Sequence, residues 1–364
     1  MNEKKILIAT GGTGGHIIPA YSLAKFLLSK DFKVELTTDT RGLRFLKNNK
    51  DLKIAKIKTS TLNKSSFLKL IFSISIILFS IISSIFFLIF NRPSIIFGMG
   101  GYSSFPICIA AFILRIKFVI YENNLIIGKA NKYLLPFTKK IFVSYKDLEG
   151  VSEKYKNKIH EIGNILREEI IHFSEKNYVE DKFDKINILV LGGSQAAKVF
   201  AENLPEIFKD LRDSNIPFKI IQQCQKNQNN QLSQYYQSKK IDFEIFNFTN
   251  EIIDYYSKSN LVITRSGASV LGELINMKIP FISIPLPSSA DNHQLKNAKF
   301  YVKRGYGYLL EEKDVKNKLN HLIKSLFEDK FLTKNILFNQ RQYSDKNVFR
   351  NLYIQIEKIL NEKN

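Results

Sequence analysis

The chain has 364 residues and a mass of 42.1 kDa, more than one ordinary hydrophobic core organises, so we expect two domains. Apolar residues make up 45% and charged residues 24%, a balance that excludes a mainly disordered protein. The 54 Lys and Arg against 34 Asp and Glu give a net charge of +20, which favours an anionic partner. Two widely separated cysteines, Cys108 and Cys224, exclude a disulfide scaffold and a cysteine-rich zinc module.

Short β-branched runs alternate with helical stretches along almost the whole chain, which indicates βαβ units and parallel sheets. The first series of predicted strands comprises Ile6–Ala9, Val34–Thr37, Ile54–Ile57, Ile95–Phe97, Phe118–Tyr121 and Ile141–Ser144. The second comprises Ile188–Leu191, Phe218–Gln222, Glu244–Phe248, Leu261–Thr264 and Phe281–Ile284. Each series begins with a strand that runs into a glycine turn. We therefore predict an α/β protein of two Rossmann-like, doubly wound domains that face a cleft.

The predicted domains are residues 1–166 and 167–343, with the polar stretch from Glu168 to Asp184 as the linker. The charge is unevenly divided, because residues 1–166 carry 25 Lys and Arg against 10 Asp and Glu, whereas the remainder carries 29 against 24. We expect the N-terminal domain to be the part that meets an anionic surface.

One segment resembles a membrane span, since Leu70–Phe90 contains 21 residues without a charge. Predicted strands precede and follow it, and a spanning helix would divide the sheet that they form. We therefore favour a helix that lies beside the sheet with an apolar outer face, although an ordinary buried helix and a true transmembrane helix stay as alternatives. Ser73, Ser80 and Ser84 fall within about 40° of one another on such a helix. Basic residues nearby suggest attachment to an anionic membrane: Lys47, Lys50, Lys53, Lys56, Lys58, Lys64, Lys69 and Arg92.

A glycine-rich motif, Gly11-Gly12-Thr13-Gly14-Gly15-His16, follows the first strand and opens a helix. Glycines there let backbone N–H groups approach a ligand, and the helix N-terminus favours negative charge. The motif is neither Gly-x-Gly-x-x-Gly nor a Walker A loop. Asp39 ends the second strand and could hold a ribose, which keeps a dinucleotide site open as an alternative. His16 is the candidate general base.

Further polar and glycine motifs follow other predicted strands. They are Gly98-Met99-Gly100-Gly101-Tyr102, Gly192-Gly193-Ser194-Gln195, Arg265-Ser266-Gly267-Ala268 with Glu273, and His293-Gln294. A carboxylate such as Glu273 can accept two hydrogen bonds from a ribose diol, and the helix N-termini favour phosphate. Each motif alone is a weak signal, but their order and their shared position at strand ends are together specific.

With Glu122, Asn124, Asn164 and Arg167 added, these motifs resemble the MurG family of N-acetylglucosaminyltransferases, which complete the lipid-linked disaccharide of peptidoglycan. The resemblance covers nearly the whole chain. It implies the two-domain GT-B fold, donor binding by the C-terminal domain, and a final helix from about Ser344 that packs back on the N-terminal domain. It also implies a role in cell-wall synthesis, and through it in cell shape and division.

The resemblance implies an inverting transfer of GlcNAc from UDP-GlcNAc to the 4-hydroxyl of undecaprenyl-diphosphate-linked MurNAc-pentapeptide, with no cofactor and no metal. His16 would be the base. The implied substrate-binding residues are Thr13, Gly14 and Gly15 in the cleft, Asn124 and Gln294 on GlcNAc, Arg167 and Ser194 on the diphosphate, Thr249 at the uracil, Ala268 in the Arg-Ser-Gly-Ala turn, and Glu273 on the ribose. The implied location is peripheral, on the cytoplasmic face of the cell membrane.

The chain departs from the family pattern at a few positions. Tyr121 stands where the family has histidine, Ile165 replaces a proline after Gly-Asn, and Ser269-Val270 replaces Leu-Thr. A GT-B enzyme that glycosylates another lipid is the alternative within enzymes. A nucleic-acid-binding protein is the alternative outside them, but no zinc spacing or aromatic RNA-binding motif supports it, so we expect no nucleic-acid partner.

Overall fold

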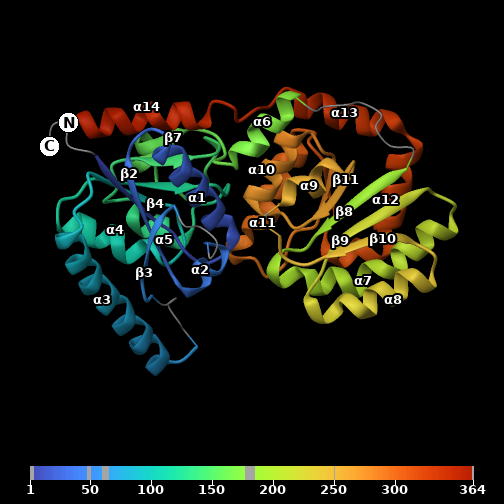
Figure 1. Cartoon of the computed structure of the whole chain (residues 1–364), viewed down its shortest axis with the longest axis horizontal. Coiled ribbons are helices and arrows are strands. Elements are labelled where there is room, and N and C mark those ends of the chain that lie inside the picture. The colour runs from blue at the N-terminus through green and yellow to red at the C-terminus, as the bar shows by residue number, and fades with distance from the viewer. Residues whose placement is uncertain (1–3, 47–50, 60–64, 177–184, 250, 363–364) are drawn as a thin grey trace. The chain divides into compact units, whose positions relative to one another are not determined.

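The computed structural model describes residues 4–46, 51–59, 65–176, 185–249 and 251–362, and within these it leaves the side chains of 174–176 and 194–197 undescribed. The chain divides into two compact units, one of residues 1–167 and 345–364 and the other of residues 168–344. Each unit is an α/β layer structure in which helices cover the strands (Figure 1).

The first unit contains a parallel sheet of seven strands among its described residues, in the order β3-β2-β1-β4-β5-β6-β7. Its strands are β1 (Lys5–Ala9), β2 (Lys33–Thr38), β3 (Lys53–Lys56), β4 (Ile95–Gly98), β5 (Phe118–Glu122), β6 (Ile141–Val143) and β7 (Ile159–Glu161). Its α-helices are α1 (Gly14–Leu28), α2 (Thr40–Leu46), α3 (Phe67–Phe90), α4 (Ser104–Ile113), α5 (Lys129–Leu134) and α14 (Val348–Asn361).

The second unit contains a parallel sheet of six strands in its described part, in the order β10-β9-β8-β11-β12-β13. Its strands are β8 (Ile186–Leu191), β9 (Phe218–Gln223), β10 (Asp242–Phe246), β11 (Leu261–Thr264), β12 (Phe281–Ser283) and β13 (Tyr308–Leu309). Its α-helices are α6 (Glu168–Lys176), α7 (Gly193–Asp213), α8 (Asn229–Ser238), α9 (Ile252–Ser257), α10 (Ala268–Met277), α11 (His293–Lys303), α12 (Val315–Glu328) and α13 (Lys330–Arg341).

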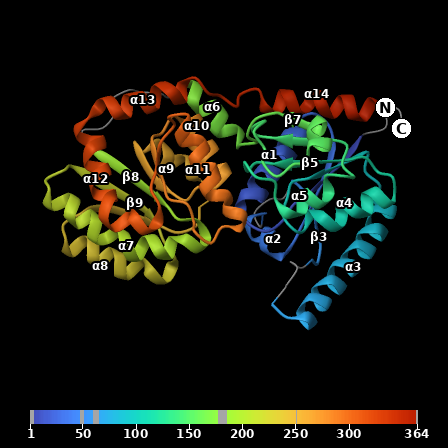
Figure 2. The same ribbon diagram turned by 180° about the vertical axis from the view of Figure 1, so that it is seen from behind.

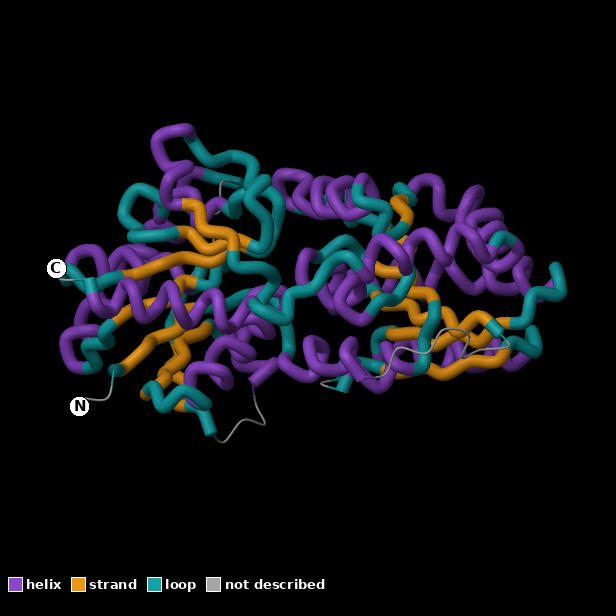
Figure 3. The backbone as a smooth tube through the Cα atoms, turned by 90° about the horizontal axis from the view of Figure 1, so that it is seen from above, coloured by secondary structure: helices purple, strands orange, loops and turns teal. Residues whose placement is uncertain are grey.

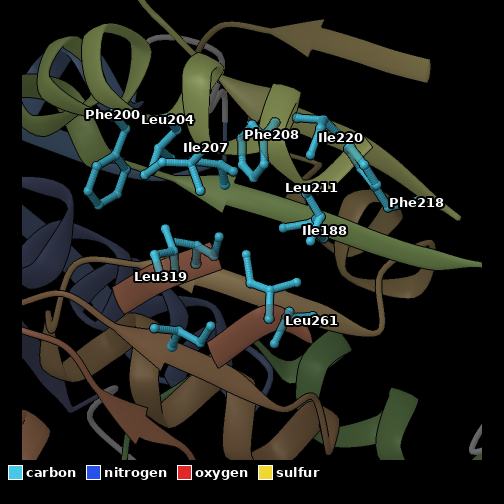
Figure 4. Packing of buried hydrophobic residues seen from close by; sticks show 14 of the residues in the cluster. Ile188, Phe200, Leu204, Ile207, Phe208, Leu211, Phe218, Ile220, Leu261 and Leu319 are labelled. Carbon is cyan, nitrogen blue, oxygen red and sulfur yellow. The ribbon is translucent and has the colours of Figure 1, made fainter. Parts of the chain in front are cut away.

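The central strands are buried on both faces, as continuous apolar runs such as Ile6–Ala9 and Ile188–Val190 require in a sheet covered by helices. Figure 3 shows the strands of each unit as an inner layer with helices around it. In the second unit one apolar cluster joins α7, β8 and β9, and includes Phe200, Phe208 and Ile220 (Figure 4).

The predicted strands are confirmed with small shifts, but three expectations need correction. The stretch predicted as a linker begins with a helix: α6 is amphipathic, and it buries Ile170 and Ile171 and packs against α10. The rest of that stretch, 177–184, lies outside the described residues. β10 ends at Phe246 instead of Phe248, and β7 and β13, of three and two residues, were not predicted.

The apolar segment is the 24-residue helix α3, which connects β3 with β4 and packs against α4. Both flanking strands belong to one sheet, as expected. Ser73, Ser80 and Ser84 are buried, and their hydroxyls donate to the carbonyl oxygens of Leu70, Ile76 and Ser80 in the same helix. The apolar side chains face outward: Phe67, Leu68, Ile71, Phe72, Ile74, Leu78, Phe79, Ile82, Phe86, Ile89 and Phe90 are all exposed. Length and composition make α3 the one described helix that could cross a membrane.

The last helix, α14, packs on the first unit. The ring of Phe349 stacks on Phe26 of α1 with centroids 4.7 Å apart. Lys140, which precedes β6, donates to Oε1 of Gln355 at 2.9 Å. The chain therefore returns to its first unit after completing the second.

Candidate active site

The sheet of the first unit has its topological switch point between β1 and β4. β1 pairs with β2 on one side and with β4 on the other, and the chain proceeds from these two strands in opposite directions along the sheet. Ligands of open α/β sheets bind at such a point, outside the carboxyl ends of the strands. The glycine segments 11–15 and 98–101 follow β1 and β4, so both lie there.

The two glycine segments touch through their backbones. Gly101 has φ +76°, and a Cβ atom on it would lie 2.6 Å from the carbonyl oxygen of Gly11. The N–H of Met99 donates to the carbonyl oxygen of Ala9 at 2.8 Å. Glycine is therefore required at position 101 by both conformation and space.

His16 lies in the first turn of α1, half-buried, with its ring against the second glycine segment. A Cβ atom on Gly100 would lie 2.9 Å from both Nδ1 and Cε1 of His16. The hydroxyl of Thr10 donates to the carbonyl oxygen of His16 at 3.1 Å. Thr13 is exposed and Gly14 and Gly15 are half-buried, so the helix start presents accessible groups beside this imidazole.

Asp39 organises the first glycine loop instead of facing a ribose. Its carboxylate accepts from the N–H of Gly12 at 3.2 Å and of Gly42 at 2.8 Å, and from the guanidinium of Arg41 at 2.8 Å. Burial by itself would raise the pKa of Asp39, but these donors outweigh it and hold that pKa below its ordinary value. The dinucleotide alternative loses the residue on which it depended.

The loop after β5 joins the same edge of the sheet. Asn123 donates from Nδ2 to the carbonyl oxygen of Gly15 at 3.1 Å. The buried carboxylate of Glu122 accepts from Nδ2 of Asn124 at 2.9 Å and from the N–H of Gly128 at 2.8 Å. The contacts to Glu122 fix the side chain of Asn124, whose predicted partner is a sugar hydroxyl.

Arg167 is the last residue of the first of the two segments that form the first unit, and it is half-buried. Three buried residues precede it, Asn164, Ile165 and Leu166. The backbone that carries the guanidinium is therefore held in the protein interior.

In the second unit the switch point lies between β8 and β11, and two helices begin beside it. α10 starts at Ala268, after Gly267 as N-cap, and no side-chain hydrogen bond caps it. A helix N-terminus favours an anion. α7 starts at Gly193, whose N–H donates to Oε1 of Gln223 at 3.2 Å. Ser194 belongs to α7, but its side chain lies outside the described residues.

Glu273 is buried in α10 and accepts a hydrogen bond from the hydroxyl of Tyr256 at 2.8 Å. Tyr256 was not predicted as a site residue, because no motif surrounds it. Only its place in a helix between two strands of the second unit could have indicated it.

Gln294 lies in the first turn of α11, and its Oε1 accepts from the N–H of Leu286 at 2.9 Å. This contact fixes the plane of the amide.

Thr249 is half-buried after β10, and its hydroxyl accepts from the N–H of Glu251 at 3.0 Å.

Arg265, in the Arg-Ser-Gly-Ala turn, is a structural residue. Its guanidinium donates to the carbonyl oxygen of Ile284 at 3.2 Å, pairs with Glu312 at 2.5 Å and lies over the ring of Phe200. These contacts hold the turn that leads into α10. The buried side chain of Arg265 therefore stabilises the backbone at Ala268, where α10 begins.

Comparison with known proteins assigns the family. The family model described as the glycosyltransferase family 28 N-terminal domain matches residues 6–143, and the one described as its C-terminal domain matches residues 187–347. The chain belongs to glycosyltransferase family 28.

Relatives and a solved structure agree with this assignment. A protein of Pelagibacter ubique named UDP-N-acetylglucosamine--N-acetylmuramyl-(pentapeptide) pyrophosphoryl-undecaprenol N-acetylglucosamine transferase is 36% identical, over 99% of both chains. A protein of Rickettsia felis with the same name is 36% identical, over 86% of this chain and 87% of its own. The crystal structure of Acinetobacter baumannii MurG is 25% identical, covers 98% of this chain and 99% of its own, and has a TM-score of 0.76. The fold is GT-B, as predicted.

Proposed function

We propose that the protein transfers GlcNAc from UDP-GlcNAc to the 4-hydroxyl of undecaprenyl-diphosphate-linked MurNAc-pentapeptide, and so makes the lipid-linked disaccharide of peptidoglycan. The observation that carries this proposal is the Pelagibacter ubique relative, which is named for this transfer and aligns with 99% of the chain. The glycine segments, Glu273 and the N-terminus of α10 support it, because they suit a nucleotide diphosphate.

The proposed donor residues are mainly in the second unit. Glu273 binds the ribose diol, and Thr249 faces the uracil through its backbone. Ser194 and the helix start at Ala268 bind the diphosphate together with Arg167. Because departure of UDP builds negative charge on the phosphates, fixed N–H groups and one guanidinium stabilise the transition state.

The proposed sugar and acceptor residues are mainly in the first unit. Asn124, held by Glu122, and Gln294, held by Leu286, present amides to hydroxyls of GlcNAc. His16 removes the proton of the attacking 4-hydroxyl, while Thr13, Gly14 and Gly15 line its approach. Direct attack without a covalent intermediate inverts the anomeric centre.

We further propose that the protein attaches peripherally to the cytoplasmic face of the membrane through α3. The outer face of this helix is apolar, and Figure 1 and Figure 2 both show its N-terminal end running out from α4. Lys53, Lys56, Lys58, Lys69 and Arg92 lie near it in the chain, whereas Lys47, Lys50 and Lys64 fall outside the described residues. A cavity of about 260 Å³ just beyond its C-terminal end is lined by four cations, Lys4, Arg92, Arg115 and Lys117.

The helix spans no bilayer in this proposal, because β3 and β4 at its two ends belong to one sheet. Apolar side chains would enter the acyl boundary, and the basic residues would meet anionic headgroups. The lipid-linked acceptor is then within reach of the protein.

The deciding experiment measures transfer of labelled GlcNAc from UDP-GlcNAc to defined lipid acceptors. Transfer to the muramoyl-pentapeptide lipid, retained in EDTA, is the expected result. Transfer only to a diacylglycerol or a simple polyprenol would contradict the proposed acceptor and identify the protein as a glycosyltransferase for another lipid. Loss of transfer in EDTA, with recovery in magnesium, would contradict the proposed charge stabilisation by N–H groups and Arg167.

A further inference from the structure

The segment before Arg167, residues 163–166, is held by a hydrogen-bonded contact with Asp345, which lies where the chain returns to the first unit. The carboxylate of Asp345 accepts from the backbone N–H of Asn164 at 2.9 Å and from its Nδ2 at 2.9 Å. Gly163 has φ +102°, and a Cβ atom on it would lie 2.6 Å from Oδ1 of Asp345, so the carboxylate of Asp345 packs closely on the backbone of Gly163.

A second hydrogen bond holds the next residue, Ile165, and its acceptor is a side chain of the sheet. The hydroxyl of Tyr121, at the end of β5, accepts from the backbone N–H of Ile165 at 3.1 Å. The same hydroxyl lies 3.0 Å from Oγ of Ser144. Tyr121 is only 3% exposed and Ile165 1%, so water cannot replace this hydrogen bond.

Burial also keeps the hydroxyl protonated. It raises the pKa of Tyr121 above the ordinary range of a tyrosine, and the nearby carboxylates of Asp345 and Glu122 act in the same direction. A neutral hydroxyl can accept from Ile165 while it donates its own proton elsewhere.

We infer that Tyr121 is a positioning residue for donor binding, because its hydroxyl fixes the backbone of Ile165 two residues before Arg167. The inference rests on the proposed contact between Arg167 and the donor diphosphate. A guanidinium recognises phosphate through directed N–H bonds, so a shift of its backbone weakens that contact without removing the charge.

The hydrogen bond depends on both residues. Ile165 has the N–H that Tyr121 requires, and a proline at that position would have none. The tyrosine at 121 and the non-proline residue at 165 therefore work as a pair.

The test is a double-mutant cycle on the full-length protein. Tyr121→Phe leaves the Ile165 N–H without its acceptor and should raise the KM for UDP-GlcNAc about three- to tenfold. It should lower kcat as well, because Arg167 also stabilises the charge that develops on the phosphates. Arg167→Ala should raise the same KM more strongly. The double variant should match Arg167→Ala alone, because Tyr121 acts through Arg167.

Two further variants separate positioning from stability. Tyr236→Phe removes another buried tyrosine hydroxyl, which donates to Gln222 in the second unit, and should lower thermal stability without changing the KM. Ile165→Pro removes the donor of the hydrogen bond to Tyr121, so in combination with Tyr121→Phe it should raise the KM no further than Tyr121→Phe alone.

The outcomes distinguish the inference from the proposed function. Additive effects of Tyr121→Phe and Arg167→Ala, or an unchanged KM in folded Tyr121→Phe, would overturn the inference and leave the donor site intact. A wild-type KM in Arg167→Ala would overturn the donor role of Arg167 and the inference with it.

Discussion

The hydroxyl of Tyr256 donates to Oε2 of Glu273 at 2.8 Å, and both side chains are almost completely buried. A buried carboxylate needs donors that keep it ionised and oriented. Tyr256 provides one of them from a different helix, α9. The hydrogen bond therefore fixes the side chain of Glu273, the residue proposed to bind the ribose, against α9.

Replacement of Glu273 by alanine should weaken UDP-GlcNAc binding by about 1.5–3 kcal/mol, because the ribose loses a charged acceptor. Tyr256→Phe should weaken it less, since the carboxylate stays but loses its orienting donor. Calorimetry on the folded variants measures both, with Tyr236→Phe as the buried-tyrosine control. Donor affinity unchanged in Glu273→Ala would remove this residue from the site.

His16→Ala should lower turnover about 10²- to 10⁴-fold at saturating substrates if His16 is the general base, with a smaller effect on donor affinity. Gly100→Ala tests the same residue from the opposite side, because its Cβ atom would press on the imidazole at 2.9 Å. It should reduce turnover at least about tenfold through displacement of that ring.

Gly150→Ala is the matched control for Gly100→Ala. Gly150 has φ +83°, close to the +80° of Gly100, but its Cβ atom would meet Ile127 instead of His16. Both variants carry the same backbone strain. Equal losses of turnover would mean that strain, and not the histidine, explains the effect of Gly100→Ala.

The stability of the first unit should depend on Asp39 in acid. The folded state holds the pKa of Asp39 below its ordinary value, so its contribution is present at neutral pH and is lost as the pH falls through the folded pKa. Asp39→Asn should lower the free energy of unfolding by about 1.5–3 kcal/mol at pH 7 and flatten its decline in acid. Denaturant unfolding at several pH values measures both, and a parallel decline in the two proteins would contradict the assignment.

The fold and the position of the glycine motifs were predictable, because they depend on local patterns. An apolar run followed by glycines marks the end of a buried strand, and the carboxyl ends of parallel strands share one edge. β7 and β13 are too short to show a period. The polar composition of α6 predicts a linker, although Ile170 and Ile171 give the helix one buried face.

The contacts that organise the site were not predictable, since they join residues far apart in the chain. The hydrogen bond from Gly12 to Asp39 joins residues 27 positions apart in the sequence, and the one from Ile165 to Tyr121 joins residues 44 positions apart. Each partner alone looks ordinary in the sequence. For α3, the predicted polar stripe and apolar outer face are confirmed, because both depend on helical spacing and on the flanking strands. The hydrogen-bond partners of the buried serines were not predicted.

The apolar outer face of α3 should make the protein bind lipid vesicles. Phe72 and Phe79 are 68% and 65% exposed on one side of the helix, two turns apart. Burial of such side chains at the acyl boundary gives affinity for any bilayer, and each basic residue near an anionic surface adds about 1 kcal/mol. The protein should therefore prefer anionic over neutral vesicles, and high salt should abolish the preference but not all binding.

Phe72→Gln combined with Phe79→Gln should weaken binding to both kinds of vesicle and leave UDP-GlcNAc affinity unchanged. Phe331 and Phe338 on α13, which are 67% and 63% exposed, provide the matched control, because the same double replacement there removes equal apolar surface from the second unit. Equal losses in the two variants would show that binding is unspecific and not through α3. Protection from protease of only one end of α3 in sealed vesicles would contradict the peripheral arrangement, because β3 and β4 would then lie on opposite sides of the bilayer despite their common sheet.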